Sequence, residues 1–174
     1  MEEEARKRSA EAARSWLENM SKKKPATDEA VWVGGFFDAL CHSDLCISRI
    51  QDGRIICSFR VPAYLTDEDG NWQPGAIATI MDNVGAAAIM TMVGLIKVSV
   101  EFDISYFAPA KANEEVEIDA RIVEHKGRKL SAVLVEVRKK GGGHLVAVGR
   151  QWMSSARPAG IETASKRINT ASRL

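Results

Sequence analysis

The most apolar stretch of the chain contains one aspartate, and this residue is the first candidate for chemistry. Between Gln73 and Ile96 the residues are small, polar-neutral or apolar, and Asp82 carries the only formal charge. A carboxylate in such surroundings is costly unless it is paired, reaches water or performs a function. Two other interpretations stay open. Asp82 could serve structure alone, by hydrogen-bonding a neighbouring backbone or a partner subunit. The stretch could also be a membrane span, although an aspartate at its centre costs about 2.5–3.5 kcal/mol.

A long helix is predicted to position this carboxylate. Pro74 suits the first turn, where its missing N–H is not needed, and Gly94 suits the helix end. Apolar residues occur on every side between them, which is typical of a helix surrounded by protein. Two shorter helices are predicted before it, one over residues 3–20 and one carrying residues 32–40.

Alternating apolar and polar residues on both sides of the long helix predict strands. The predicted strands are residues 45–50, 54–61, 98–106, 116–122, 130–137 and 145–153. Asp52-Gly53 indicates a hairpin turn, and hairpins predict an antiparallel sheet with its helix on one face. In the third strand the apolar residues from Val98 to Tyr106 share one face. Ser99 is therefore predicted on the opposite, polar face.

The chain divides into three predicted regions. Residues 1–30 are a charged N-terminal helical extension, residues 31–154 are the main domain, and residues 155–174 lose the hydrophobic pattern and indicate a disordered tail. The tail ends in Ser172-Arg173-Leu174, which is similar to the peroxisomal import tripeptide. We therefore expect a peroxisomal import receptor as partner and a peroxisomal location, or a cytoplasmic one if the tail is not read.

Composition argues against several function classes. A net charge of +1 gives no global field that favours nucleic acid. Cys41, Cys46 and Cys57 have neither paired nor metal-ligand spacing, and their odd number fits a reducing compartment. The acidic residues after Met1 are unlike a secretory signal. We expect no metal, no cofactor, no nucleic-acid partner and no membrane span.

The order of elements and two sequence blocks resemble the hotdog-fold thioesterases, and within them the small acyl-CoA thioesterases of the PaaI-like group. The blocks are Gln73–Asn83 and Val98–Ala110, and the resemblance runs from about Leu40 to Ser154. It implies an α+β hotdog fold, in which an antiparallel sheet wraps around a long central helix. It also implies hydrolysis of an acyl-CoA to a free acid and CoA, at a site shared between subunits of a homodimer or homotetramer.

The resemblance gives roles to individual residues. Asp82 matches the helix carboxylate that acts as general base towards water or as nucleophile on the thioester, and Ser99 matches the strand hydroxyl that holds the attacking water. The family usually opens this helix with His-Gly-Gly, but here the positions are Gln73-Pro74-Gly75. Proline has no N–H, so the usual oxyanion donor is missing, at a typical cost of about 10²–10³ in rate. The Gln73 amide and the Gly75 N–H are the candidates to replace it.

The resemblance also implies contacts with substrate. A polar residue of the loop before the helix, Asn71 or Asp67, lies where family members contact the substrate, and a cationic hairpin tip suits the phosphates of CoA. An ordinary solvated turn is the alternative for that tip. The candidate substrate-binding residues are Asn71, Pro74, Asn83, Lys126, Arg128 and Lys129.

Helix geometry adds a constraint that does not depend on the resemblance. Pro74 and Asp82 are eight positions apart, which is about 12 Å at a rise of 1.5 Å per residue. One carbonyl cannot touch both, so we expect the helix start of one subunit to meet Asp82 of another. Two alternative functions remain: a catalytically weak hotdog protein that binds acyl-CoA or another acyl ligand, and a hotdog hydratase. The hydratase is weaker because the helix and the loop before it contain no histidine.

Overall fold

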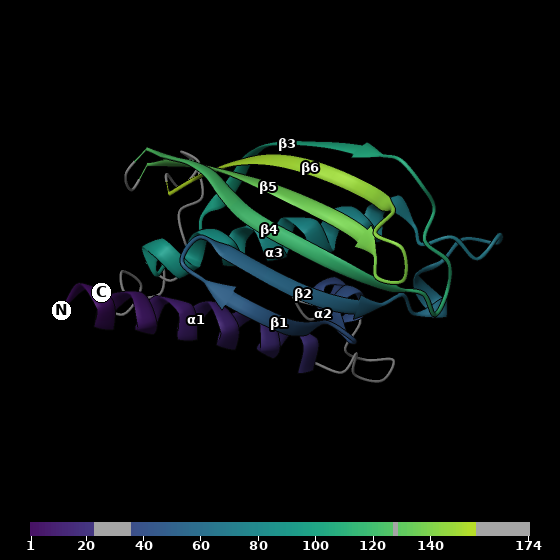
Figure 1. The fold of residues 1–174 in the computed structure, drawn as a ribbon, viewed down its shortest axis with the longest axis horizontal. Helices are drawn as coiled ribbons and strands as arrows, with labels where there is room; N and C mark the ends of the chain where they lie inside the picture. Colours follow the sequence, from purple (N-terminus) through teal and green to yellow (C-terminus); the bar gives the residue numbers. More distant parts are fainter. Residues whose placement is uncertain (23–35, 127–128, 156–174) are drawn as a thin grey trace, which may run out of the picture.

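A computed structural model of the protein describes residues 1–22, 36–126 and 129–155. Figure 1 shows a curved sheet with a long helix on its inner side. The helices are α1 (Glu2–Lys22), α2 (Phe36–His42) and α3 (Pro74–Val93), with a short 3₁₀ helix at Ala63–Leu65. The strands are β1 (Cys46–Gln51), β2 (Arg54–Arg60), β3 (Val98–Tyr106), β4 (Glu115–Lys126), β5 (Leu130–Lys139) and β6 (Leu145–Ser154).

The sheet has the strand order β1-β2-β4-β5-β6-β3, and every neighbouring pair is antiparallel. Short connections join β1 to β2, β4 to β5 and β5 to β6. Such connections can link only antiparallel neighbours, because a parallel pair needs a long crossover. β3 follows α3 in sequence but lies at the far edge, beside β6 (Figure 1). The predicted antiparallel sheet wrapped on a central helix is confirmed.

The central helix α3 has the ends that its sequence predicts. Pro74 occupies the first turn, and Gly94 ends the helix in the left-handed region with φ 70°, where its N–H donates to the Met90 carbonyl at 2.8 Å. Most residues between Ala76 and Thr91 are buried, because the sheet curves around the helix. Of the described residues, only α3 is long and apolar enough to cross a membrane, and most of it is buried within the fold.

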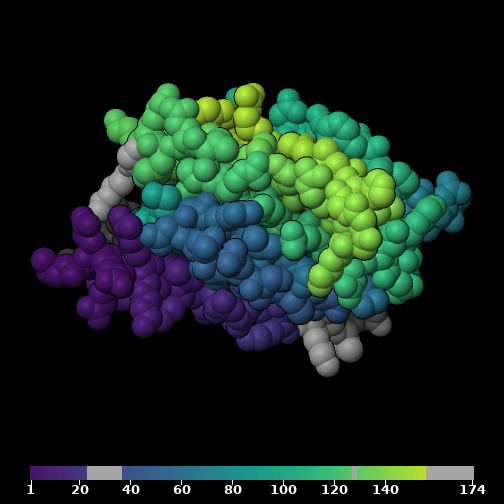
Figure 2. Space-filling model, viewed as in Figure 1, coloured from purple at the N-terminus to yellow at the C-terminus, as the bar shows by residue number. Residues whose placement is uncertain are grey.

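The two edges of the sheet differ. α1 lies beside β1 (Figures 1 and 2). It also packs on α3, and its side chains Ala13, Leu17 and Met20 are buried. Arg6 of α1 also forms an ion pair at 3.2 Å with Asp52, in the turn after β1. The β1 edge is therefore flanked by a helix. The β3 edge carries exposed apolar side chains instead, including Val98 and Val100.

A β-bulge changes the faces of β3. Its pairing with β6 shifts register between Ser99 and Glu101, so Ser99 pairs with Met153 while Phe102 pairs with Gln151. Met153 and Gln151 are both buried and two residues apart, so they lie on the inner face of β6. Ser99 therefore faces α3 together with Phe102. The predicted strict alternation, which put Ser99 on the polar outer face, is wrong because one extra residue in the strand reverses the facing.

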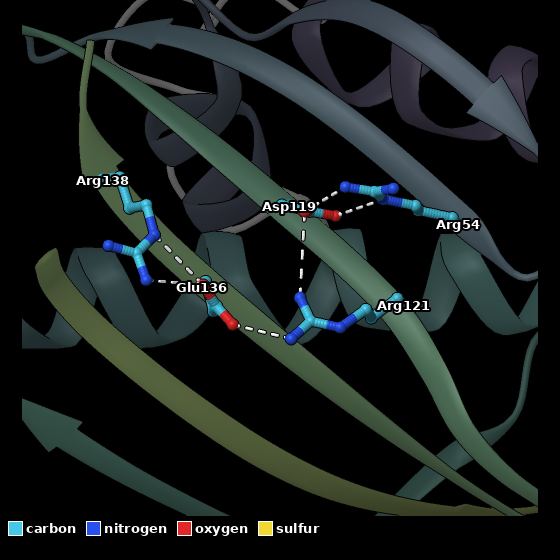
Figure 3. A network of polar contacts seen from close by, with 5 residues as sticks. All are labelled: Arg54, Asp119, Arg121, Glu136 and Arg138. Atoms are coloured by element: carbon cyan, nitrogen blue, oxygen red, sulfur yellow. Dashed lines mark hydrogen bonds and ion pairs between the residues drawn. The ribbon is translucent and has the colours of Figure 1, made fainter. Parts of the chain in front are cut away.

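The outer face of the sheet carries a continuous chain of ion pairs (Figure 3). Arg54 on β2 makes a bidentate contact with Asp119 on β4, with N–O distances of 2.9 and 2.6 Å. Arg121 bridges Asp119 at 3.8 Å and Glu136 on β5 at 2.7 Å, and Arg138 donates to Glu136 at 2.9 Å. Arg121, by hydrogen bonding, lowers the pKa of Glu136, and Arg138 adds to this. The network joins three guanidinium groups to two carboxylates, so this face is polar and ion-paired, unlike the β3 edge.

The three cysteines are all free. Burial raises the pKa of Cys57 to about 12, and burial together with the nearby Asp38 raises that of Cys41 to about 11. These two thiols stay protonated and unreactive at neutral pH. Predictions that concern residues 23–35, 127–128 and 156–174 lie outside the described residues. They include the start of the short helix over residues 32–40, Arg128, and the tail with Ser172-Arg173-Leu174.

Candidate active site

Asp82 is the centre of a three-residue hydrogen-bond cluster built by α3, β3 and β6. The Ser99 hydroxyl donates to Asp82 Oδ1 at 2.6 Å. The Gln151 amide nitrogen Nε2 donates to the same oxygen and also to Ser99 Oγ, the latter at 2.8 Å. The structure thus brings together Asp82 and Ser99, which the sequence singled out, and adds Gln151, which it did not.

Gln151 is fully buried, and the absence of a side chain at Gly85 leaves space for its amide group. A Cβ atom added at Gly85 of α3 would lie 2.6 Å from Gln151 Oε1. The sequence contained one signal for this residue: Gln151 is the polar member of an otherwise small or apolar inner face of β6, together with Ala147, Gly149 and Met153.

The cluster runs from the core to the surface. Gln151 is buried, Asp82 is half-buried and Ser99 is exposed. The hydrogen bonds that the described residues make to Asp82 all go to Oδ1. A carboxylate has two oxygens and about four lone-pair directions, so Oδ2 keeps its capacity to accept a proton or a hydrogen bond. The aspartate is held on one side and open on the other.

A second group of polar atoms surrounds the first turn of α3. Pro74 has no N–H, and the N–H groups of Ala76 and Ile77 both donate to the Gln73 carbonyl at 3.0 Å. The Gly75 N–H has no acceptor among the described residues, and a Cβ there would meet open space. The Gln73 amide makes a long contact of 3.4 Å with the Thr66 carbonyl and is exposed.

A cavity of about 290 Å³ opens beside this first turn. Its walls include Asn71, Trp72, Pro74, Ile77, Tyr106 and Phe107. The Tyr106 hydroxyl donates to the Pro74 carbonyl at 3.1 Å, and burial raises the pKa of this phenol. Asn71 donates from its backbone to Asp67 at 2.8 Å, which is the main cause of the lowered pKa of Asp67. The cavity is thus mainly apolar, with amide and hydroxyl groups at its rim.

Comparison with known proteins agrees with this geometry. A profile of the thioesterase superfamily matches residues 70–146, which include α3 and the strands β3, β4 and β5. Acyl-coenzyme A thioesterase 13 of Mus musculus is 36% identical over 115 residues, which are 66% of this chain and 81% of that protein. The chain belongs to the thioesterase superfamily.

Solved structures of other thioesterases have the same fold as this chain. The crystal structure of zebra fish thioesterase superfamily member 2 superposes with a TM-score of 0.69 at 25% identity, covering 82% of this chain and 94% of that one. A hypothetical thioesterase protein from Streptococcus pneumoniae, crystallised with coenzyme A, has a TM-score of 0.60 at 21% identity, covering 64% and 85%. At that identity the second likeness shows the fold. The predicted hotdog thioesterase fold is confirmed.

Asn83 of the thioesterase lies apart from the Asp82 cluster. Its amide donates to Asp38 Oδ1 at 3.2 Å and contacts His42 Nε2 at 3.4 Å, so it faces α2. His42 is fully buried, its Nδ1 contacts the Asp38 carbonyl at 2.7 Å, and burial lowers its pKa. A neutral imidazole with its proton on Nδ1 can accept from Asn83. These contacts join α2 to α3. The substrate-binding role of Asn83 stays a prediction.

The predicted phosphate-binding residues lie at the β4–β5 hairpin. Lys126 forms an ion pair with Glu124 at 3.1 Å, and its ammonium lies 6.0 Å from the centre of the Trp152 ring. Lys129 is exposed, and Arg128 lies outside the described residues. The structure therefore keeps Lys126 and Lys129 on one hairpin, away from the first turn of α3.

Among the described residues, no group of three or more His, Cys, Asp or Glu side chains is arranged to hold a metal ion.

Proposed function

We propose that this thioesterase hydrolyses an acyl-CoA thioester to a free acid and CoA, with Asp82 as the group that activates water. The observation that supports this most is the half-open Asp82–Ser99–Gln151 cluster, in which one carboxylate oxygen is held and the other is available. The names of the mouse and human relatives, both acyl-coenzyme A thioesterase 13, support the substrate class.

In the proposed reaction one water molecule lies between Asp82 Oδ2 and Ser99 Oγ. Because the Ser99 proton is already donated to Asp82 Oδ1, Ser99 Oγ can only accept from this water. The water then loses its second proton to Oδ2 as its oxygen attacks the thioester carbon. General base catalysis of this kind contributes about 10²–10⁴ in rate. The tetrahedral intermediate collapses with loss of the CoA thiolate, which takes up the proton from Asp82.

The proposed oxyanion donor is the Gly75 N–H, assisted by the Gln73 amide. Gly75 supplies the first-turn N–H that lacks an acceptor within the described residues, and the positive end of the helix dipole adds to its effect. Pro74 removes the donor that the preceding position would otherwise give. The acyl group would enter the cavity of about 290 Å³ beside this turn. The CoA phosphates would be held by cations of the β4–β5 hairpin.

We further propose a homodimer as the smallest active unit, formed through the β3 edge. Val98, Val100, Tyr106 and Phe107 expose 43%, 60%, 46% and 62% of their surface along or next to this strand. Such an apolar open edge invites pairing with another chain. Pro74 and Asp82 lie about 12 Å apart on α3 by helix rise, so a partner could supply the half of the site that one copy lacks.

A peroxisomal location remains a proposal that rests on Ser172-Arg173-Leu174. A fluorescent fusion of the full chain should be punctate in cells with peroxisomes, and the same fusion without these three residues should be diffuse. Unchanged puncta in the truncated fusion would show that the tail is not the signal.

Release of free CoA from a panel of acyl-CoAs tests the proposed activity. Wild type should turn over at least one acyl-CoA, and Asp82→Asn should lose about 10²–10⁴ in kcat. A protein that only binds its ligand would show a dissociation constant without CoA release in either form. A hydratase would consume an enoyl-CoA without releasing CoA.

The same assay run in ¹⁸O-water for a single turnover tests for a covalent intermediate that is hydrolysed at Asp82. Direct attack of water on the thioester puts the label only in the product acid, as does hydrolysis of an acyl-aspartate at its acyl carbon. A covalent acyl-aspartate that is hydrolysed at the Asp82 carbon would leave ¹⁸O in the protein.

A further inference from the structure

We propose that Gln151 is a positioning residue of this site, whose amide fixes the direction of the hydrogen bonds at Asp82 and Ser99 so that Oδ2 alone faces the water. This inference rests on the proposed function. Gln151 touches Asp82 and Ser99 and acts on the reaction through them.

The three hydrogen bonds form a closed triangle with one possible direction. The Gln151 Nε2 group has only protons to give, and it gives one to Asp82 Oδ1 and one to Ser99 Oγ. Since Ser99 Oγ accepts from Gln151, its own proton must point to Asp82 Oδ1. Without the amide, the hydroxyl could rotate and donate to the water, which would lower the nucleophilicity of that water. The amide therefore fixes the direction of the Ser99 O–H bond as well as the position of the Asp82 carboxylate.

The orientation of the amide group is itself fixed. If the amide were turned over, Oε1 would face Asp82 Oδ1 with no proton between the two oxygens, and this contact would be repulsive. The single Ser99 proton could then be donated either to Oε1 or to Asp82 Oδ1, but not to both. The orientation found leaves Oε1 buried without a hydrogen-bond partner among the described residues. A buried unsatisfied acceptor of this kind costs about 1–3 kcal/mol. For stability alone, an apolar side chain of similar size would serve better at this position.

The helix that carries Asp82 also contains a destabilising glycine next to this amide. Gly85 lies in the interior of α3, where glycine costs about 0.5–1 kcal/mol relative to alanine. A Cβ at Gly85 would lie 2.6 Å from Gln151 Oε1 and within 3.3 Å of side-chain atoms of Val133 and Val135. Two unfavourable features, an unsatisfied oxygen and an interior glycine, thus coincide at the residue that holds Asp82.

An amide does not titrate, so the two donors of Gln151 are present at every pH. Glutamate has the same length and shape but donates only when protonated, and its carboxylate repels Asp82. Methionine fills a similar volume and donates nothing. These two variants separate donation from packing.

The test measures kcat and KM against pH for wild type, Gln151→Met and Gln151→Glu, with Gln51→Met on exposed β1 as the matched control. For Gln151→Met we expect kcat to fall by about 10–100-fold with little change in KM, since misplacing a reacting group costs up to about 10²-fold. Gln151→Glu should retain more of its activity at acid pH than at alkaline pH. Gln51→Met should behave as wild type.

An unchanged kcat in Gln151→Met, or a Gln151→Glu profile parallel to that of wild type, would overturn the proposal. A second measurement does not need turnover: the side-chain ¹⁵N–¹H resonances of Gln151 should move in Asp82→Asn and in Ser99→Ala. If no acyl-CoA is hydrolysed but these resonances move, the proposed function fails while the hydrogen-bond triangle stands. If turnover is normal and the resonances stay fixed in both variants, the role of Gln151 fails alone.

Discussion

Ser99 and Phe102 lie on the same face of β3, although they are three residues apart and a regular strand would put them on opposite faces. The bulge between Ser99 and Glu101 brings the hydroxyl inward, where it reaches Asp82 at 2.6 Å. Phe102 is thereby free to pack on the core at the next inner position. The site hydroxyl is thus placed by an irregularity in the strand.

Ser99→Ala should lower kcat by about 10-fold to 10²-fold, because Asp82 Oδ1 loses a donor and the water loses an acceptor. The melting temperature should change little, because Ser99 is exposed. Ser105→Ala, another exposed serine of β3, is the matched control and should keep wild-type kcat. Equal rates in all three proteins would remove Ser99 from the mechanism.

Gly85→Ala should destabilise the fold by about 1–3 kcal/mol, as overpacking of a core does. It should also reduce kcat, because the new Cβ would displace the Gln151 amide 2.6 Å away. Urea unfolding and CoA release measure the two effects. Gly141→Ala meets nothing within 4 Å and should leave both unchanged. A stable and fully active Gly85→Ala protein would contradict the tight packing at Gln151.

Pro74→Gly should raise kcat, since it returns a first-turn N–H to the site. The upper limit is about 10²–10³-fold, the usual cost of one missing oxyanion donor. The variant should lose up to about 1 kcal/mol of stability, because glycine has more freedom in the unfolded chain. If kcat is unchanged while the structure persists, Gly75 and Gln73 already provide full stabilisation of the oxyanion.

Val100→Lys should split the proposed dimer, because it puts a charge on an exposed apolar position of the β3 edge. Light scattering should give a monomer mass, and activity should fall with the loss of the partner. Val123→Lys on β4, where the side chain is similarly exposed, is the control and should stay dimeric. A fully active monomer would refute a site shared between copies.

Glu136→Gln should destabilise the protein by about 1 kcal/mol at neutral pH and progressively less at acid pH. Arg121 and Arg138 lower the pKa of Glu136 in the folded state. Its stabilising contribution is therefore present above the ordinary glutamate value of about 4.3 and is lost as pH falls through the lower folded value. Urea midpoints at several pH values measure this. Glu101→Gln, whose partner Arg150 is 4.0 Å away and exposed, should show a smaller effect.

Much of the fold could be predicted because local signals and the global fold agree. Pro74 and Gly94 bound α3 as their backbone preferences require, and Asp52-Gly53 makes the β1–β2 turn, with Gly53 at φ 73°. The uniform apolarity of α3 predicts a helix enclosed by protein, and most of α3 is buried. A lone carboxylate in that apolar setting makes Asp82 the first candidate for chemistry.

The rest depended on relations between strands that no local pattern contains. In a β-bulge one strand has an extra residue opposite its partner strand. The extra residue between Ser99 and Glu101 can therefore be recognised only when the pairing of β3 with β6 is known. Gln151 is distant in sequence from Asp82, and its contact with Ser99 depends on the pairing of β6 with β3. Asn83 neighbours Asp82 in sequence, yet a helix turns by about 100° per residue, so it points towards α2.

The helix that flanks β1 has a consequence for how copies can assemble. Each chain offers one strand edge that is free to recruit another chain, at β3, while α1 occupies the space beside the other edge. Two chains joined through β3 would present only helix-flanked margins to further copies. The sheet would then stop growing once two chains had joined, and the N-terminal helix would prevent further strand pairing into fibres.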